Sequence, residues 1–187
     1  IPFMKGYTVF NAGQVDGLPA HFYAMQNPAL DTVARVEKAE AFFAATGAEI
    51  QEGGNRACYN VTTDRVQMPP FVSFIEAEAY YATLAHEICH WTRHPKRLNR
   101  DFGRKRFADE GYAMEELVAE LGAAFVSADL ALTPAPREEH AAYIGCWLKV
   151  MKDDKRAIFS AAAHAQRAAD YLAGLQLVEK GEEREAA

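Results

Sequence analysis

The residues best suited to chemistry lie in one pentapeptide, HEICH, at positions 86–90. On a helix, His86 and His90 are four residues apart and project from the same face. Two imidazoles placed in this way can both bind one Zn²⁺ at about 2.0–2.1 Å. Glu87 points to the rim of the same site, where a carboxylate can take a proton from a water that the metal activates. The pattern therefore predicts a hydrolase with Zn²⁺ as its cofactor and Glu87 as its catalytic residue.

A catalytic zinc site needs a third protein ligand and keeps one position open for water. The metzincin pattern would place a His and a Gly at two later positions, but these residues are Lys96 and Arg93. His94 lies one turn beyond His90, but Pro95 follows it and disfavours helical backbone there. We therefore expect the third ligand to come from another segment.

The segment MEELVAE at 114–120 offers that ligand. Glu116 and Glu120 are four residues apart, so on a helix they share one face. Both border the apolar stripe that Leu117 and Leu121 set. Two carboxylates at the edge of a buried face are costly unless a cation compensates them. We expect Glu116 to bind the metal and Glu120 to accept the second N–H of a metal-binding His. Glu115 and Glu120 remain alternatives for the ligand, although we expect Glu115 to face solvent because it points about 100° away.

The elements that position these residues follow from the spacing of apolar side chains. Helical spacing predicts helices at about 31–47, 75–91 and 111–132, and one or two more over 137–177. Strand composition is found at 5–10, 49–52, 57–60 and 65–68, and the last two flank a polar turn that predicts a β-hairpin. The apolar stripe of the 75–91 helix lies opposite its two His, so we expect this helix to be covered on both sides.

Composition narrows the class of protein further. A length of 187 residues, of which 50% are hydrophobic, suits one domain with a sizeable core. The net charge of −6 argues against a nucleic-acid-binding surface over the whole domain.

Cys58, Cys89 and Cys146 form no CxxC pair, which predicts reduced, buried thiols and a cytoplasmic location. Cys89 points about 100° away from His90 on the helix, so we expect a core residue rather than a ligand. No apolar run approaches about 18 residues, so we expect no membrane-spanning segment. The first residues are not a signal peptide, and the chain does not begin with Met, so we expect a piece of a larger protein.

A basic stretch from Arg93 to Arg106 follows the HEICH segment. It contains Pro95 and Gly103, so we expect much of it to be loop. Its side chains could contact phosphate beside the site, but a solvated surface loop is the simpler interpretation.

Together these motifs resemble the zincin-like metallopeptidase domain of ArdC-type antirestriction proteins, which also occurs in TraC-type plasmid primases. The resemblance is carried by residues 82–92, 94–95, 97–98 and 112–121, with further matches at 7–11, 64–70, 140–144 and 147–148. We expect an α+β, zincin-like fold with a small N-terminal β-sheet packed on the HExxH helix and a mostly helical C-terminal half. One such domain would span residues 1–177, followed by a charged, disordered tail at 178–187.

The resemblance also implies a function. It implies a gluzincin-like zinc site on His86, His90 and Glu116, with Glu87 as the catalytic acid and base of peptide-bond hydrolysis. The expected substrate is a protein or peptide met during antirestriction or plasmid transfer. Family members commonly carry an N-terminal single-stranded-DNA-binding domain, which we expect as a partner outside this chain, and we expect no direct nucleic-acid binding by the chain itself. The alternative is a non-catalytic module, stabilised by zinc, that binds protein or protects DNA.

Two groups of residues are candidates for substrate contacts. In zincin-type folds, the edge of a sheet beside the active helix aligns the substrate. We expect this role for the strand formed by Arg65, Val66, Gln67 and Met68, to which a peptide could add by backbone hydrogen bonds. Tyr112 or His140 could donate a hydrogen bond to an oxyanion, and the sequence does not choose between them.

Overall fold

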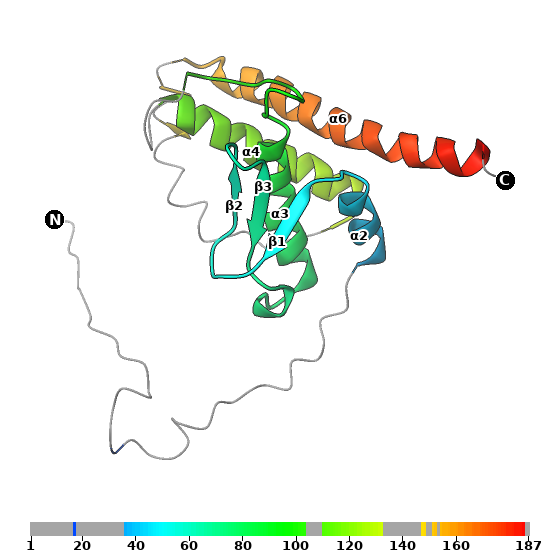
Figure 1. The fold of residues 1–187 in the computed structure, drawn as a ribbon. Coiled ribbons are helices and arrows are strands. Elements are labelled where there is room, and N and C mark those ends of the chain that lie inside the picture. Colours follow the sequence, from blue (N-terminus) through cyan, green and yellow to red (C-terminus); the bar gives the residue numbers. More distant parts are fainter. Residues whose placement is uncertain are drawn as a thin grey trace. The chain divides into compact units, whose positions relative to one another are not determined.

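The computed structural model describes residues 36–103, 110–132 and 154–185, together with Gly17 and residues 147–148 and 151–152. Contacts divide the chain into two units, Ile1–Thr32 and Val33–Ala187, and every described helix and strand belongs to the second. In chain order these elements are α2 (Glu37–Ala44), β1 (Glu49–Glu52), β2 (Cys58–Asn60), β3 (Arg65–Met68), the 3₁₀ turn η2 (Phe71–Ser73), α3 (Ala77–Trp91), α4 (Glu110–Asp129) and α6 (Ala157–Glu185) (Figure 1).

The helices and strands that we expected within the described residues are present, and β1 and β3 have the expected bounds, whereas α2 is shorter than the expected helix at 31–47. Helix exceeds strand by a wide margin, as the α+β expectation requires. The expected strand at 5–10 lies outside the described residues. α6 continues to Glu185 and so extends through most of the segment that we expected to be a disordered tail. Among the described residues, no helix combines the length and the apolar character needed to cross a membrane.

The sheet has three strands in the order β1-β3-β2. β3 pairs in parallel with β1 and antiparallel with β2, so the expected β2–β3 hairpin is confirmed. Asn60 shapes the turn by accepting hydrogen bonds from the backbone N–H groups of Thr62 and Thr63, at 2.9 and 3.1 Å. Asp64 takes the left-handed conformation, with φ of 55°, at the last position before β3.

The position of β3 corrects one expectation. Because β3 is the middle strand, the backbone groups of Arg65, Val66, Gln67 and Met68 are used by β1 and β2. A peptide therefore cannot add to this strand as we expected, since strand addition needs an unpaired edge. Val66 and Met68 instead serve the core, where both are fully buried.

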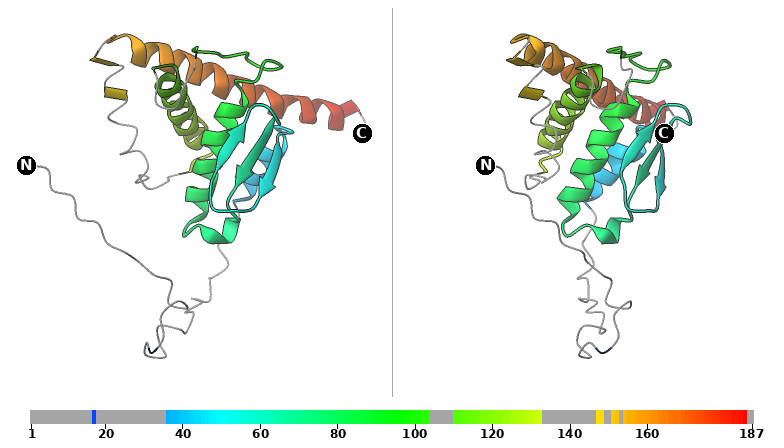
Figure 2. Two further views of the ribbon diagram at one scale, coloured as in Figure 1. Left: turned by 60° about the vertical axis from the view of Figure 1, so that its left-hand side comes forward. Right: turned by 90° about the vertical axis from the view of Figure 1, so that its left-hand side faces the viewer.

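α3 lies between the sheet and α4 (Figure 2). Every residue from Leu84 to Trp91 is buried, which confirms that the helix is covered on both sides. Toward the sheet, Tyr81, Leu84 and Ile88 pack in one core cluster with Val66 and Met68. The opposite face, which carries the two His, meets α4.

α4 is buried on two faces because α3 and α6 both pack against it (Figure 2). Ala119, Ala123 and Val126 belong to the core cluster that contains α3 residues, whereas Leu117 and Val118 cluster with Ala161 and Ala165 of α6. The single apolar stripe that the sequence predicts for this helix therefore covers only one of its two buried faces.

Candidate metal centre

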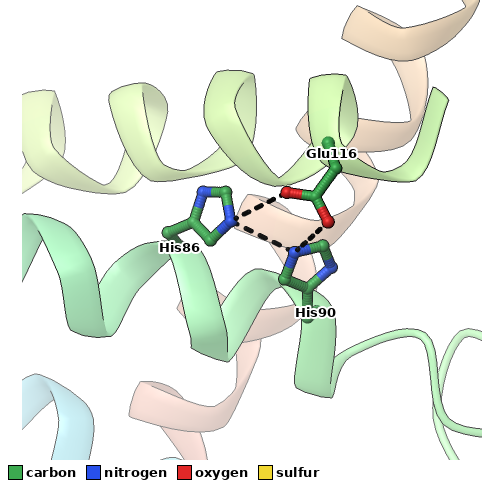
Figure 3. A group of neighbouring side chains, drawn as sticks. All are labelled: His86, His90 and Glu116. Carbon is green, nitrogen blue, oxygen red and sulfur yellow. Dashed lines mark hydrogen bonds and ion pairs between the residues drawn. The ribbon is translucent and has the colours of Figure 1, made fainter. Parts of the chain in front are cut away.

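Three side chains from two helices converge between α3 and α4 (Figure 3). His86 and His90 lie one turn apart on α3, and their Nε2 atoms are 3.1 Å apart. Glu116 of α4 places Oε2 at 3.5 Å from His86 Nε2 and Oε1 at 3.5 Å from His90 Nε2. One potential ligand atom from each residue lies within 4.8 Å of the others, and all three residues are buried. The structure thus brings together the three residues that we expected to bind the metal.

The far side of each imidazole faces a carboxylate. His90 Nδ1 lies 3.1 Å from Glu115 Oε1 in a buried hydrogen bond. His86 Nδ1 lies 3.2 Å from Glu120 Oε1, off the line of a good hydrogen bond. An N–H on Nδ1 suits both carboxylates, so the lone pairs of the two Nε2 atoms face each other and Glu116. This set of two imidazoles and one carboxylate fits a divalent transition metal ion.

The surrounding acids favour positive charge at this point. Burial by itself would lower the pKa of His90, but hydrogen bonds with Glu115 and Glu116 outweigh it and raise this pKa to about 10. Burial also opposes ionisation of Glu116, yet hydrogen bonds with His86 and His90 hold its pKa well below the usual range. The negative charge of these carboxylates can be balanced by two protons on the imidazoles or by one divalent metal ion.

Glu87 differs from the other acids of the site. It is buried, with 8% of its surface exposed. Within the part of the chain that the structure describes, its carboxylate forms no hydrogen bond or ion pair with another residue. A buried carboxylate in this state calls for a partner other than the side chains that the structure describes, such as water.

Glu115 corrects a second expectation. We expected it to face solvent, but it is 2% exposed. It lies between His90 and the buried Arg100, which donates hydrogen bonds of 2.8 Å to each of its carboxylate oxygens. Burial opposes ionisation of Glu115, but Arg100 and His90 outweigh it and lower the pKa to about 2. The one sequence signal for the pairing of Glu115 with Arg100 was the basic stretch from Arg93 to Arg106, which we interpreted as a solvated loop.

The remaining candidates have different outcomes. Tyr112 is buried on α4, one turn before Glu116. His140 lies outside the described residues. Cys89 is fully buried, and burial raises its pKa to about 12, so it is a neutral core thiol as we expected. Cys58, which we also expected to be buried, is exposed on the short strand β2. Arg97, in the basic stretch, stacks on the Trp91 ring at 3.7 Å.

Comparison with known proteins identifies relatives of this chain. The sequence profile of a family described as zincin-like metallopeptidase matches residues 37–164. The uncharacterized protein y4eC of Sinorhizobium fredii is 46% identical over 170 residues, which are 91% of this chain and 54% of that protein. The DNA primase TraC of Escherichia coli is 43% identical over 166 residues, which are 88% of this chain and 15% of the primase. The chain therefore spans about half of the first relative and a small part of the second.

Two crystal structures of the antirestriction protein ArdC from plasmid R388 are also similar. The Mn(II)-bound structure has a TM-score of 0.70 and 47% identity, over 94% of this chain and 64% of that one. The metal-free structure has a TM-score of 0.69 and 48% identity, over 95% of this chain and 62% of that one. The resemblance to ArdC-type and TraC-type proteins and the zincin-like fold are confirmed. The Mn(II)-bound relative and the His-His-Glu site together indicate a divalent metal cofactor.

Proposed function

This chain belongs to the zincin-like metallopeptidase family, and we propose that it hydrolyses peptide bonds with a divalent metal ion held by His86, His90 and Glu116. One observation carries the proposal. Glu87 is a buried carboxylate next to the metal-binding residues that has no hydrogen-bond partner in the described part of the chain. The other acids of the site each face an imidazole nitrogen. A carboxylate kept free at this place can bind water and deprotonate it.

The residues of the site divide the reaction between them. A bound metal ion would polarise the scissile carbonyl and lower the pKa of a water molecule toward about 7. Glu87 accepts a proton as the water oxygen bonds to the carbonyl carbon, and it gives that proton to the leaving amine nitrogen as the C–N bond breaks. Glu115 accepts a hydrogen bond from His90 Nδ1–H, and Glu120 lies 3.2 Å from His86 Nδ1, so both carboxylates favour the proton on Nδ1 and leave the Nε2 lone pairs for the metal.

The metal and the substrate class are part of the proposal. Two imidazoles and one carboxylate suit Zn²⁺, and the Mn(II)-bound relative makes Mn²⁺ the natural comparison. We expect the substrate to be a protein met in antirestriction or plasmid transfer, in keeping with the names of the relatives. A separate single-stranded-DNA-binding domain would bring the chain to its substrate.

The test is the variant Glu87→Gln. It should bind Zn²⁺ as the wild type does but cleave a peptide library, read by mass spectrometry, about 10²–10⁴-fold more slowly, because the amide cannot accept the proton. Glu78→Gln, in the first turn of the same helix, is the matched control and should leave cleavage unchanged.

The alternative function gives the opposite pattern. In a non-catalytic module stabilised by zinc, Glu87→Gln would be harmless in an antirestriction protection assay, whereas His86→Ala would abolish protection by removing the metal. That result, or wild-type protein loaded with metal that cleaves no member of the library, would contradict the hydrolase proposal.

A further inference from the structure

We propose that Arg100 is a positioning residue of the metal centre, which fixes the ring of His90 through Glu115. The inference rests on the proposed metal site and names a residue outside its ligands. Arg100 lies after the end of α3, and only 5% of its surface is exposed. Burying a guanidinium is costly without hydrogen-bonding partners, so the partners of Arg100 must be built into the fold.

Those partners lie in two parts of the structure, α4 and the C-terminal end of α3. The guanidinium grips Glu115 of α4 as a fork, with Nε to Oε2 at 2.8 Å and Nη2 to Oε1 at 2.8 Å. Nη2 also donates to the backbone oxygen of Cys89 at 3.0 Å, at the end of α3. Nη1 donates to Thr92 Oγ1 at 3.1 Å. Arg100 therefore ties the C-terminal end of the HExxH helix to the helix that carries Glu116.

The fork determines how Glu115 meets His90. Two parallel bonds hold the carboxylate in the plane of the guanidinium, so it cannot rotate freely. Its Oε1, which accepts one of these bonds, lies 3.1 Å from His90 Nδ1. The imidazole must then place its N–H on Nδ1 and keep the Nε2 lone pair for the metal.

The imidazole of His86 is held less firmly than that of His90 by its neighbouring carboxylate. Glu120 approaches His86 Nδ1 at 3.2 Å without good alignment, and its side chain is 16% exposed against 3% for Glu115. We infer that His90 is the fixed ligand of the centre, and that Arg100 determines how well the centre binds metal.

The experiment measures metal affinity and uses no peptide. Zn²⁺ and Mn²⁺ are titrated into metal-free protein against a chelating dye, for the wild type, Arg100→Lys and the control Arg97→Lys. Arg97 lies in the same segment, its side chain is 8% exposed, and its hydrogen bonds go to Asp64, Tyr59 and the backbone of Trp91 rather than to the metal site. Lysine keeps the charge at either position but loses the fork.

Arg100→Lys should weaken metal binding about 10–100-fold and change the visible spectrum of the Co²⁺-loaded protein. Arg97→Lys should lower the thermal midpoint of the metal-free protein while leaving affinity and spectrum unchanged. If Arg100→Lys does not fold, Glu115→Gln provides the same measurement, with the same weakening expected.

Equal affinity in Arg100→Lys and the wild type would overturn the inference, and so would equal weakening in the two arginine variants. Because no substrate is present, a chain that binds metal but cleaves nothing would refute the proposed hydrolysis and leave this inference standing.

Discussion

At the scale of single residues, Glu115 and Glu116 are neighbours in the chain with different partners. Glu116 faces the Nε2 atoms of both imidazoles, whereas Glu115 faces Nδ1 of His90. One step along a helix turns the side chain by about 100°, so two consecutive acids can reach opposite sides of one ring. The ring of His90 is therefore held between them, and the two glutamates are not interchangeable.

A second arrangement at this scale, only partly buried, anchors the hairpin rather than the metal. Arg97 forms an ion pair with Asp64, and Tyr59 donates a hydrogen bond to the same carboxylate at 2.8 Å. The Arg97 hydrogen bond holds the pKa of Asp64 below its usual range, although burial opposes this. Asp64 also occupies the left-handed position before β3, which Asn tolerates well.

Asp64→Asn tests this arrangement through pH. A carboxyl whose pKa is lower in the folded state stabilises the fold above its unfolded pKa of about 3.9, and that contribution is lost as the pH falls through the folded pKa. At pH 7 the variant should lose about 1 kcal/mol, or roughly 2–4 °C in thermal midpoint. The gap between wild type and variant should shrink as the pH falls below the unfolded pKa of about 3.9, because Asp64 protonates as the pH passes through its lowered folded pKa. A gap that stays constant with pH would contradict the account.

At the scale of elements, the site depends on how closely α3 and α4 approach. Gly122 of α4 lies against Cys89 of α3, and a Cβ added at position 122 would lie 2.6 Å from Cys89 Sγ. Real Cβ atoms do not approach other heavy atoms so closely, so the two helices can meet at this distance only without a side chain there. The same approach brings Glu116 to the two imidazoles.

Gly122→Ala should therefore separate the helices, destabilise the fold by about 1–3 kcal/mol and weaken metal binding. Thermal unfolding and metal titration measure both effects. Gly174→Ala is the control, because nothing lies within 4 Å of a Cβ there, and it should stabilise α6 by about 0.5–1 kcal/mol. Adding Cys89→Ala to Gly122→Ala removes the sulfur and should recover part of the loss. A Gly122→Ala midpoint equal to the wild type would refute this packing argument.

The elements also show what the sequence could predict and what it could not. The α3 helix, the β2–β3 hairpin and the placing of His86 and His90 on one face follow from local spacing in the sequence. The choice of Glu116 as their partner came from a second segment and from the family resemblance. The middle place of β3 depends on its parallel pairing with β1, a contact between separate segments that alternation along one strand does not encode. The expectation that Glu115 faces solvent was wrong because α4 has two buried faces. A pattern with one apolar stripe predicts that the second of these faces is exposed.

At the scale of the whole molecule, the metal links the two helices that form the site. A chain with a net charge of −6 buries acids from both helices around two imidazoles, so positive charge at their centre stabilises the folded arrangement. A metal ion that binds only the folded state should raise the thermal midpoint in proportion to the logarithm of its concentration. Metal content and stability should therefore change together.

The most direct measurement is the metal content and thermal midpoint of purified wild type, Glu87→Gln and Glu116→Ala after exposure to Zn²⁺ and removal of free ion. We expect about one ion per chain, and a higher midpoint than in the chelated protein, for the wild type and for Glu87→Gln. Glu116→Ala should lose the ion and the increase in midpoint. Wild-type protein that retains no divalent ion, or Glu116→Ala that retains it as firmly as the wild type, would contradict the account.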